Sequence, residues 1–269
     1  MPGSQPLSAD PVRRVAVITH GTPERIRDAV ARLEAVAADA GVELVEDAES
    51  PDLAVVLGGD GTMLRALQRF LGTGVPVLGV NFGRVGFLTS VPGAELEAGL
   101  ARAFAGEHTV LELATLDVEA GERRAVAVND VVATSATLGR MVELEWQIGD
   151  ESLGFVACDG VICATPTGST AYNLSNGGPV LVWGVDAMAV TFAAPHSLHV
   201  RPLVVPRSSS LGAWNRTPDV GVTVLVDGHE VAQLATGEAV TVQLGDQPAL
   251  LAVLPEATFF RRYRETFAS

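Results

Sequence analysis

Five consecutive residues, Gly58-Gly59-Asp60-Gly61-Thr62, have the types and the order of a loop that handles phosphate. They follow the apolar run LAVVL and precede a helical pattern, so they fall at the carboxyl end of an expected strand, where open α/β sheets bind ligands. Glycines let the backbone approach a phosphate, and a new helix offers N–H groups and the positive end of its dipole. The spacing therefore predicts an anion site.

The acid in this loop narrows the chemistry. Asp60 would repel a phosphate unless a metal ion bridges the two groups, or unless its carboxylate accepts a proton from an attacking hydroxyl. Both interpretations indicate phosphoryl transfer. The structural alternative is an ordinary Asp-Gly turn with Thr62 as the N-cap of the helix.

Phosphate charge in this chain can be neutralised only by arginine, backbone N–H groups or Mg²⁺, because all 18 basic residues are arginines. Arg65 follows the loop by one helical turn and can face the same ligand. The absence of lysine excludes a P-loop lysine, a protein-kinase strand lysine and a Schiff base. The net charge of -14 disfavours nucleic acid and anionic membranes as general partners.

A second stretch gathers hydroxyl groups where an expected strand ends and a short helix begins. It reads TPTGSTAYNLSNGGP from Thr165 to Pro179. Hydroxyls, a tyrosine ring and the N–H groups of a new helix suit a nucleoside or a sugar-phosphate ligand. A well-capped helix explains one or two of these hydroxyls but hardly the whole run.

A polar pair, Asn129-Asp130, interrupts the apolar run AVAVNDVVA. Buried polar side chains need partners, and a carboxylate can accept two hydrogen bonds from a ribose diol. The pair is thus a candidate ribose contact. A bulge or an edge position in the expected strand is the alternative.

The hydropathy pattern predicts two domains followed by a tail. Alternating strands and helices over residues 1–110 favour an α/β Rossmann-like domain, with strands at Val15–Thr19 and Leu53–Leu57 among others. Residues 111–254 show short β-rich segments separated by turns, which favours an antiparallel all-β domain. The strands expected there are Ala114–Glu119, Arg124–Ala133, Met141–Ile148, Leu153–Ala164, Met188–Ala193, Val220–Leu225, His229–Leu234 and Ala239–Leu244. The aromatic and basic tail, residues 255–269, is expected to pack back on the first domain.

Several smaller features receive structural interpretations. Cys158 and Cys163 fall in one expected strand, Leu153–Ala164, on opposite faces, so we expect two buried thiols and no disulfide. Asp227-Gly228 reads as a hairpin turn. His196 and His199 form an HxxH pair without a third metal ligand, so no zinc is expected. The chain shows neither an apolar leader nor a membrane span, and a cytoplasmic location is expected.

Taken together, the motifs resemble the NAD kinases, which depend on ATP or polyphosphate. The resemblance rests on the GGDGT loop, the segment NFGRVGFL that begins at Asn81, the Asn129-Asp130 pair and the segment DGVICATPTGSTAYNLSNGGP. The segment PHSL with the following RPLVV matches as well. Lipid kinases and phosphofructokinases share a version of GGDGT, whereas TPTGSTAY is highly specific. The resemblance runs from about Val15 to Phe260, nearly the whole chain.

The resemblance implies transfer of a phosphoryl group from ATP or polyphosphate, with Mg²⁺ or another divalent cation, to the 2′-hydroxyl of the adenosine ribose of NAD. Asp60 would act at this hydroxyl as a base or an orienting group. Metal ligation by the protein itself is not predicted, since Mg²⁺ would arrive with the nucleotide. The residues implied in phosphate and nucleotide binding are Gly58, Gly59, Gly61, Thr62 and Arg65.

The resemblance also implies a set of NAD contacts in the second domain. Asn129 and Asp130 would hold NAD ribose, and Asp159 would lie near the adenine. Arg140 falls where the family often has a basic contact, and His229 stands where many bacterial members have glutamine. Asp60 and Gly61 join this set, and the dinucleotide site would be lined by Thr170, Ala171, Tyr172, Asn173, Leu174 and Ser175.

Assembly and departures from the family pattern complete the expectation. Family members are oligomers whose dinucleotide site draws on a neighbouring subunit, so a homodimer or homotetramer is implied. SNGGP replaces the commoner SAGGP, and FAAPHSL lacks the usual polar residue before its proline; both bear on specificity.

Two other functions are alternatives to an NAD kinase. One is a lipid kinase, which the hydroxyl-rich stretch disfavours, and the other is a non-catalytic NAD-binding regulator, which would tolerate loss of Asp60.

Overall fold

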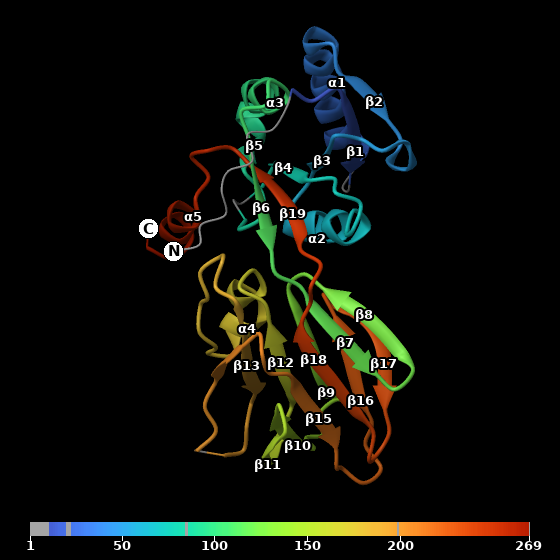
Figure 1. Ribbon diagram of the computed structural model, residues 1–269, viewed down its shortest axis with the longest axis vertical. Coiled ribbons are helices and arrows are strands. Elements are labelled where there is room, and N and C mark those ends of the chain that lie inside the picture. The colour runs from blue at the N-terminus through green and yellow to red at the C-terminus, as the bar shows by residue number, and fades with distance from the viewer. Residues whose placement is uncertain (1–10, 20–22, 84–85, 198, 269) are drawn as a thin grey trace. The chain divides into compact units, whose positions relative to one another are not determined.

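The computed structural model describes residues 11–19, 23–83, 86–197 and 199–268 and divides the chain into two compact units (Figure 1). Unit 1 comprises residues 1–113 and 248–269, and unit 2 comprises residues 114–247. The expected β-rich range, 111–254, therefore differs from unit 2 at both ends. The physical reason is strand pairing, because β6 (Thr109–Leu113) and β19 (Ala249–Val253) pair with each other in the sheet of unit 1.

Unit 1 is built on one mixed sheet with the strand order β2-β1-β3-β4-β19-β6, and β5 pairs with β4. All its pairings are parallel except β19 with β6. The expected α/β class is confirmed. The other described elements of unit 1 are β1 (Arg14–Thr19), α1 (Pro23–Ala40), β2 (Glu43–Val45), β3 (Leu53–Leu57), α2 (Asp60–Arg69), β4 (Val77–Asn81), β5 (Val91–Pro92), α3 (Leu96–Phe104) and α5 (Phe259–Phe267), with short 3-10 turns at Asp47–Glu49 and Gly93–Glu95.

Helices cover both faces of this sheet, which is why β3 is apolar at every position. Leu53, Val55 and Leu57 share a buried cluster with residues of α1 and α3. On the other face α2 packs its buried Met63 close to β4, where a Cβ on Gly79 would lie 2.6 Å from the Met63 sulfur. Glycine at this position lets α2 approach the strand that follows the candidate phosphate loop.

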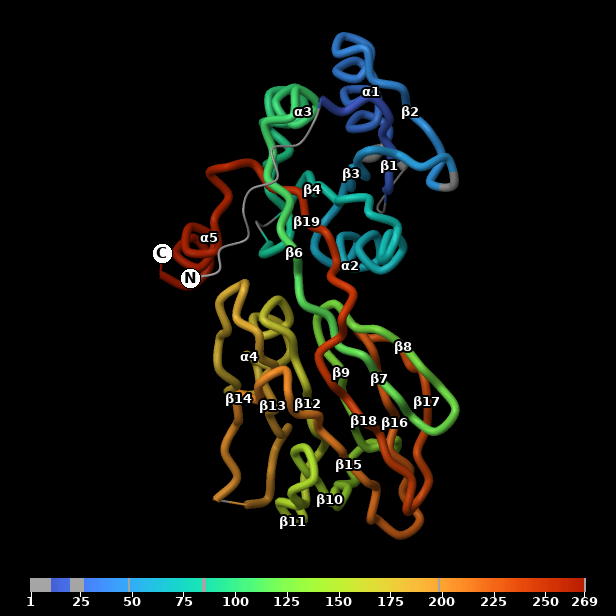
Figure 2. Tube along the Cα trace, viewed as in Figure 1, coloured from blue at the N-terminus to red at the C-terminus, as the bar shows by residue number. Residues whose placement is uncertain are grey.

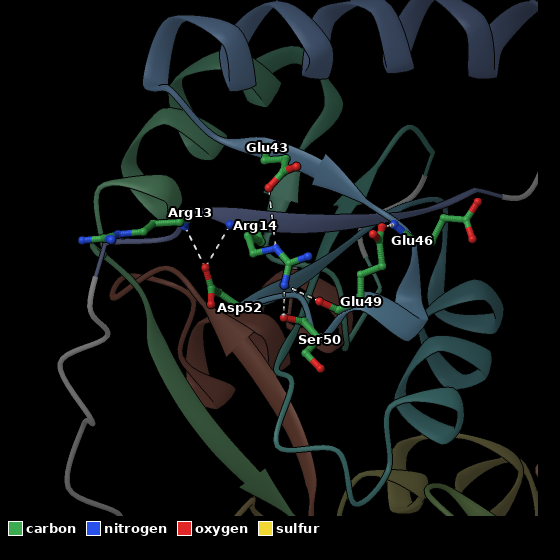
Figure 3. A network of polar contacts seen from close by, with 7 residues as sticks. All are labelled: Arg13, Arg14, Glu43, Glu46, Glu49, Ser50 and Asp52. Carbon is green, nitrogen blue, oxygen red and sulfur yellow. Dashed lines mark hydrogen bonds and ion pairs between the residues drawn. The ribbon is translucent and has the colours of Figure 1, made fainter.

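A polar network fixes the edge of unit 1 where β1, β2 and β3 begin (Figure 3). One carboxylate oxygen of Asp52 accepts hydrogen bonds from the backbone N–H groups of Arg13 and Arg14, at 2.8 and 2.9 Å. The Arg14 guanidinium donates to the carbonyl of Glu49 and lies 3.6 Å from a carboxylate oxygen of Glu43. These contacts link the starts of the three strands.

Unit 2 consists of two antiparallel sheets, whose strands are labelled along the trace in Figure 2. Their inner faces bury one valine- and leucine-rich core. The strand orders are β11-β10-β15-β18-β7-β8 and β14-β13-β12-β9-β16-β17. The expected all-β class is confirmed. The described elements are β7 (Leu116–Ala120), β8 (Arg123–Ala127), β9 (Asp130–Ser135), β10 (Val142–Ile148), β11 (Glu151–Cys158), β12 (Gly160–Ala164), a 3-10 turn (Gly168–Thr170), α4 (Tyr172–Ser175), β13 (Ala187–Ala193), β14 (Leu203–Pro206), β15 (Leu211–Asn215), β16 (Val222–Val226), β17 (His229–Leu234) and β18 (Ala239–Leu244).

Two expected strands of unit 2 are each split between the sheets, and those expectations were wrong. The run expected as one strand at Arg124–Ala133 divides into β8 and β9, so the Asn129-Asp130 pair lies where the chain leaves one sheet for the other. Likewise Cys158 ends β11 and Cys163 lies in β12. Both thiols are buried and neither forms a disulfide. Burial raises the pKa of Cys158 to about 12.

The tail belongs to unit 1 and ends in α5. Thr258 caps this helix by accepting a hydrogen bond from the Arg261 N–H at 3.2 Å. The ring of Phe87 lies 5.8 Å from the ring of Phe259 and 5.7 Å from that of Phe267, measured between centroids. The tail thus packs on the segment that follows β4. In the described ranges, every helix is too short or too polar to cross a lipid bilayer.

Candidate functional site

In unit 1 the GGDGT loop joins β3 directly to α2. Gly59 is the N-cap residue with extended backbone, and Asp60 is the first residue of the helix. The structural alternative with Thr62 as N-cap is wrong, because the N-cap is Gly59, three residues earlier, and Thr62 is buried within the first turn of the helix. A Cβ on Gly58 would lie 2.7 Å from the Thr62 hydroxyl oxygen, so this tight junction needs glycine.

The Asp60 carboxylate is held by the segment that follows β4. Its two oxygens accept hydrogen bonds from the backbone N–H groups of Phe87, at 2.8 Å, and Leu88, at 3.2 Å. A Cβ on Gly86 would lie 2.1 Å from a carboxylate oxygen, so only glycine allows this approach. Each oxygen keeps a second lone pair for a substrate hydroxyl. Arg84 and Val85, two residues of the NFGRVGFL segment, lie outside the described residues.

Arg65 occupies an exposed position on α2, five residues after Asp60. Arginine at this distance from the start of a helix can reach an anion bound at the helix N-terminus, where the dipole also favours negative charge. Arg65 therefore lies on the same helix as the loop residues, in the turn that follows them.

In unit 2 the Asn129-Asp130 turn is organised by a residue that sequence reasoning treated as structural only. The Asp227 carboxylate accepts hydrogen bonds from three consecutive backbone N–H groups, those of Val128, Asn129 and Asp130, at 2.8, 2.7 and 3.1 Å. The expected hairpin turn at Asp227-Gly228 is confirmed, with φ of 47° and 81° at its two residues. The Asp-Gly sequence alone does not indicate that Asp227 also binds the backbone of the Asn129-Asp130 turn.

The hydroxyl-rich stretch packs directly on this turn. The Thr165 hydroxyl donates to the Val128 carbonyl at 2.7 Å, and the Thr165 N–H donates to the Asn129 carbonyl at 2.9 Å. A Cβ on Gly168 would lie 1.9 Å from the same Asn129 carbonyl oxygen, so glycine is required where the two segments meet. The structure therefore brings the second and third sequence motifs together.

The side chains of the pair remain available for a ligand. Asn129 has a buried amide oxygen with no hydrogen-bond partner within the described chain. Asp130 is 7% exposed, and burial, reinforced by the negative charge of Asp227, raises the pKa of its carboxyl to about 7. A buried acceptor oxygen beside a carboxylate is the combination that two ribose hydroxyls would satisfy.

The expected dinucleotide-lining residues fall into two groups. Asn173 is fully buried; its amide nitrogen donates to the carbonyls of Ser169 and Pro179, and its amide oxygen accepts from the Thr191 hydroxyl. Tyr172 is 48% exposed, Ser175 is exposed, and the half-buried Thr170 donates its hydroxyl to the Thr167 carbonyl. Ala171 and Leu174 are half-buried beside them.

Asp159 and Arg140 do not join this cluster within the chain. Asp159 precedes β12, whose Gly160 pairs with Thr134, whereas Asp130 pairs with Ala164 at the other end of the strand. Four residues of strand correspond to about 13 Å. Arg140 lies in the exposed turn after β9, at the Asp159 end, while His229 begins β17 beside the Asp227 turn, at the Asp130 end.

No group of three or more His, Cys, Asp or Glu side chains in the described ranges is placed to hold a metal ion. Asp60 stands at the phosphate loop as a single carboxylate, already oriented by backbone N–H groups. This donor set fits an ion such as Mg²⁺, which keeps several waters and takes its other ligands from substrate phosphates.

Comparisons with known proteins agree with both halves of this description. The family model of the ATP-NAD kinase N-terminal domain matches residues 24–108, and that of the ATP-NAD kinase C-terminal domain matches residues 128–254. An NAD kinase of Heliobacterium modesticaldum is 35% identical over 260 residues, which is 95% of this chain and 86% of the relative.

Two solved structures share the fold. The yeast NADH kinase in complex with NADH superposes with a TM-score of 0.82 at 24% identity, over 96% of this chain and 88% of that one. An NAD kinase from Archaeoglobus fulgidus in complex with ATP gives a TM-score of 0.77 at 26% identity, over 94% of this chain and 99% of that one.

Proposed function

Because this chain belongs to the NAD kinase family, we propose that Asp60 and the Asn129-Asp130 pair divide its work between chemistry and substrate binding. The enzyme is an NAD kinase, which makes NADP by transferring a phosphoryl group from ATP to the adenosine ribose 2′-hydroxyl. The observation that carries the division is the Asp60 carboxylate, fixed by two backbone N–H groups at the phosphate loop.

Asp60 accepts the proton of the 2′-hydroxyl as this oxygen attacks the terminal phosphorus of the nucleotide. The new O–P bond forms as the bond to the leaving ADP oxygen breaks, and the displacement is in line. The N–H groups of Phe87 and Leu88 hold the carboxylate in one orientation and leave a lone pair on each oxygen for the hydroxyl. A positioned base of this kind contributes about 10²–10⁴ in rate.

The residues of the glycine loop and Arg65 hold the phosphates. The start of α2 provides the positive end of its dipole, and Arg65 supplies a full positive charge where the chain has no lysine. When bound with the nucleotide, Mg²⁺ neutralises charge on the transferred group. Polyphosphate offers the same anionic oxygens and is an alternative donor.

Unit 2 holds NAD through the Asn129-Asp130 turn. Asp130 accepts ribose hydroxyls, Asn129 offers its buried amide oxygen, and the exposed Tyr172 ring gives a flat surface for a base or an amide. His229, next to the Asp227 turn, is exposed on the same end of the sheet and joins this set.

A second copy of the chain completes the NAD site. Asp159 precedes Gly160, which lies about 13 Å along β12 from the residue that pairs with Asp130, and Arg140 lies in the turn at the Asp159 end, so one chain does not bring them to Asp130. In a homodimer or homotetramer a neighbouring subunit can supply Asp159 to the adenine. Co-expressing an Asp60→Asn chain with an Asp159→Ala chain should then restore part of the activity. A fully active monomer, or no rescue in verified mixed oligomers, contradicts the shared site.

The function is tested by product identity. Purified protein with Mg²⁺ is incubated with ATP or polyphosphate and with NAD, NADH or diacylglycerol as acceptor, and 2′-phosphorylated dinucleotide is measured. We expect NADP from NAD. Phosphorylated diacylglycerol without NADP would favour the lipid-kinase alternative, and NAD binding without any product would favour a non-catalytic regulator.

A further inference from the structure

Helix α5, in the tail, contributes a buried arginine to the segment that holds Asp60. Arg262 is 3% exposed, and one nitrogen of its guanidinium donates to the carbonyl oxygens of Phe87 and Thr89, the latter at 2.7 Å. Arg262 is 202 residues away from Asp60 in the sequence, and neither the GGDGT nor the NFGRVGFL motif includes it.

Arginine and aspartate bind opposite ends of one peptide group. The Phe87 carbonyl that Arg262 binds and the Leu88 N–H that donates to Asp60 belong to the same planar peptide unit. Fixing the carbonyl therefore fixes the direction of the N–H. A positive charge on the carbonyl also polarises the peptide and strengthens the N–H as a donor.

Aromatic contacts hold the same helix against the same segment. The rings of Phe259 and Phe267, on α5, lie 5.8 and 5.7 Å from the Phe87 ring between centroids. Removing the Arg262 guanidinium therefore leaves α5 with an apolar attachment to the segment. A substitution of Arg262 therefore tests the polar contacts while the aromatic contacts of α5 remain.

We propose that Arg262 is a positioning residue for phosphoryl transfer, which acts on Asp60 through the Phe87–Leu88 peptide. The proposal rests on the proposed role of Asp60. Burial lowers the pKa of Arg262 to about 10, partly offset by the charge of Asp60, so the guanidinium stays charged at neutral pH. Because it acts through the backbone, Arg262 influences the catalytic step rather than substrate binding.

The experiment compares Arg262→Gln and Arg262→Lys with Arg264→Gln, an exposed arginine on the same helix. We expect Arg262→Gln to lower kcat by about 10- to 100-fold, as loss of a supporting contact or a small misplacement does, with the KM values for NAD and ATP nearly unchanged. Arg262→Lys should keep more activity, and Arg264→Gln should match the wild type. Millimolar guanidinium should partly restore Arg262→Gln, whereas sodium chloride should not.

The Asp60→Asn variant distinguishes failure of the positioning role of Arg262 from failure of the proposed function. In the Asp60→Asn background, Arg262→Gln should cause little further loss, because the two residues act through one contact. An active Asp60→Asn enzyme would overturn the proposed function itself. An inactive Asp60→Asn enzyme with full kcat in Arg262→Gln overturns only the positioning role. The role is likewise overturned if Arg262→Gln loses its thermal unfolding transition and guanidinium restores nothing, since Arg262 is then structural.

Discussion

In unit 1 two backbone N–H groups hold the acid that we propose as the base, whereas in unit 2 an acid holds three backbone N–H groups of the turn that we propose as the ribose contact. Asp60 is the acceptor in the first case and Asp227 in the second. The hydrogen bonds are alike, but in the proposed function the carboxylate is the reacting group in one unit and the support in the other. A carboxylate on consecutive amides therefore does not by itself identify a reacting group.

Asp52 supports this conclusion. Its exposed carboxylate accepts hydrogen bonds from two consecutive backbone N–H groups, those of Arg13 and Arg14. What separates the three sites is their surroundings: a phosphate loop beside Asp60, the Asn129-Asp130 pair beside Asp227, and solvent beside Asp52. Asp52→Asn is thus a matched control for the other two.

The largest effect is expected at the reacting acid. Asp60→Asn keeps the shape of the side chain but cannot accept the proton, so kcat should fall by a factor of about 10² or more while the KM for NAD changes little. Steady-state kinetics with NAD and ATP measure both constants, with Asp52→Asn as the control. Wild-type turnover in Asp60→Asn would end the assignment.

The next effect is expected at the ribose contact. Asp130→Ala removes the carboxylate and should raise the KM for NAD by about tenfold or more, the cost of a charged hydrogen bond, and should raise it more than the KM for ATP. Varying each substrate at saturation of the other separates the two constants. An equal change in both, or none, would count against Asp130 as the NAD contact.

A smaller effect is expected at the support. Asp227→Asn keeps the left-handed turn, which asparagine tolerates, but weakens the bonds to the amides of the pair. The KM for NAD should rise by roughly tenfold or less, with kcat close to that of the wild type. If Asp227→Asn behaves like Asp52→Asn in both kinetics and thermal unfolding, the proposed difference between the two carboxylates is lost.

The smallest expected effect is the pH dependence that Asp130 gives to NAD binding and to stability. The pKa of Asp130 is raised from 3.8 to about 7, and its charged form is the better ribose acceptor, so the KM for NAD should fall several-fold from about pH 6 to about pH 8. The free energy of unfolding changes in the opposite direction: it decreases as pH rises, whereas NAD binding improves. Between about pH 4 and 7 the folded state retains a proton that the unfolded state has lost, so the stability contributed by this group decreases as pH rises. Asp130→Asn should abolish both dependences, and an unchanged pH profile in this variant would refute the assignment.

The sequence indicates candidate groups for the chemistry more readily than the groups that hold them in place. Glycine loops and polar residues in apolar runs are local signals, and they single out Asp60, Asn129 and Asp130 as candidates. Arg262 and Asp227 lie far along the chain from the groups they hold, and their contacts exist only after folding. An arginine in a tail and an Asp-Gly turn each have an ordinary local explanation.

The fold shows the same limit. Its two classes follow from the periodicity of apolar residues, but β14, β15 and β19 were not predicted. β14 is a mostly exposed edge strand, β15 reads LGAWN with little β-branched character, and β19 returns from unit 2 to pair with β4. Strand breaks at Asn129 and Asp159 were missed because both flanking runs are apolar.

Equilibrium binding of NAD to two variants tests most directly whether Asp60 acts in the chemical step and Asp130 in NAD binding. Titration calorimetry with Asp60→Asn and Asp130→Ala, both checked for intact thermal unfolding, needs no turnover. The account predicts that Asp60→Asn binds NAD with a Kd close to that of the wild type and that Asp130→Ala binds it about tenfold or more weakly. Weak binding by Asp60→Asn together with wild-type binding by Asp130→Ala would contradict it.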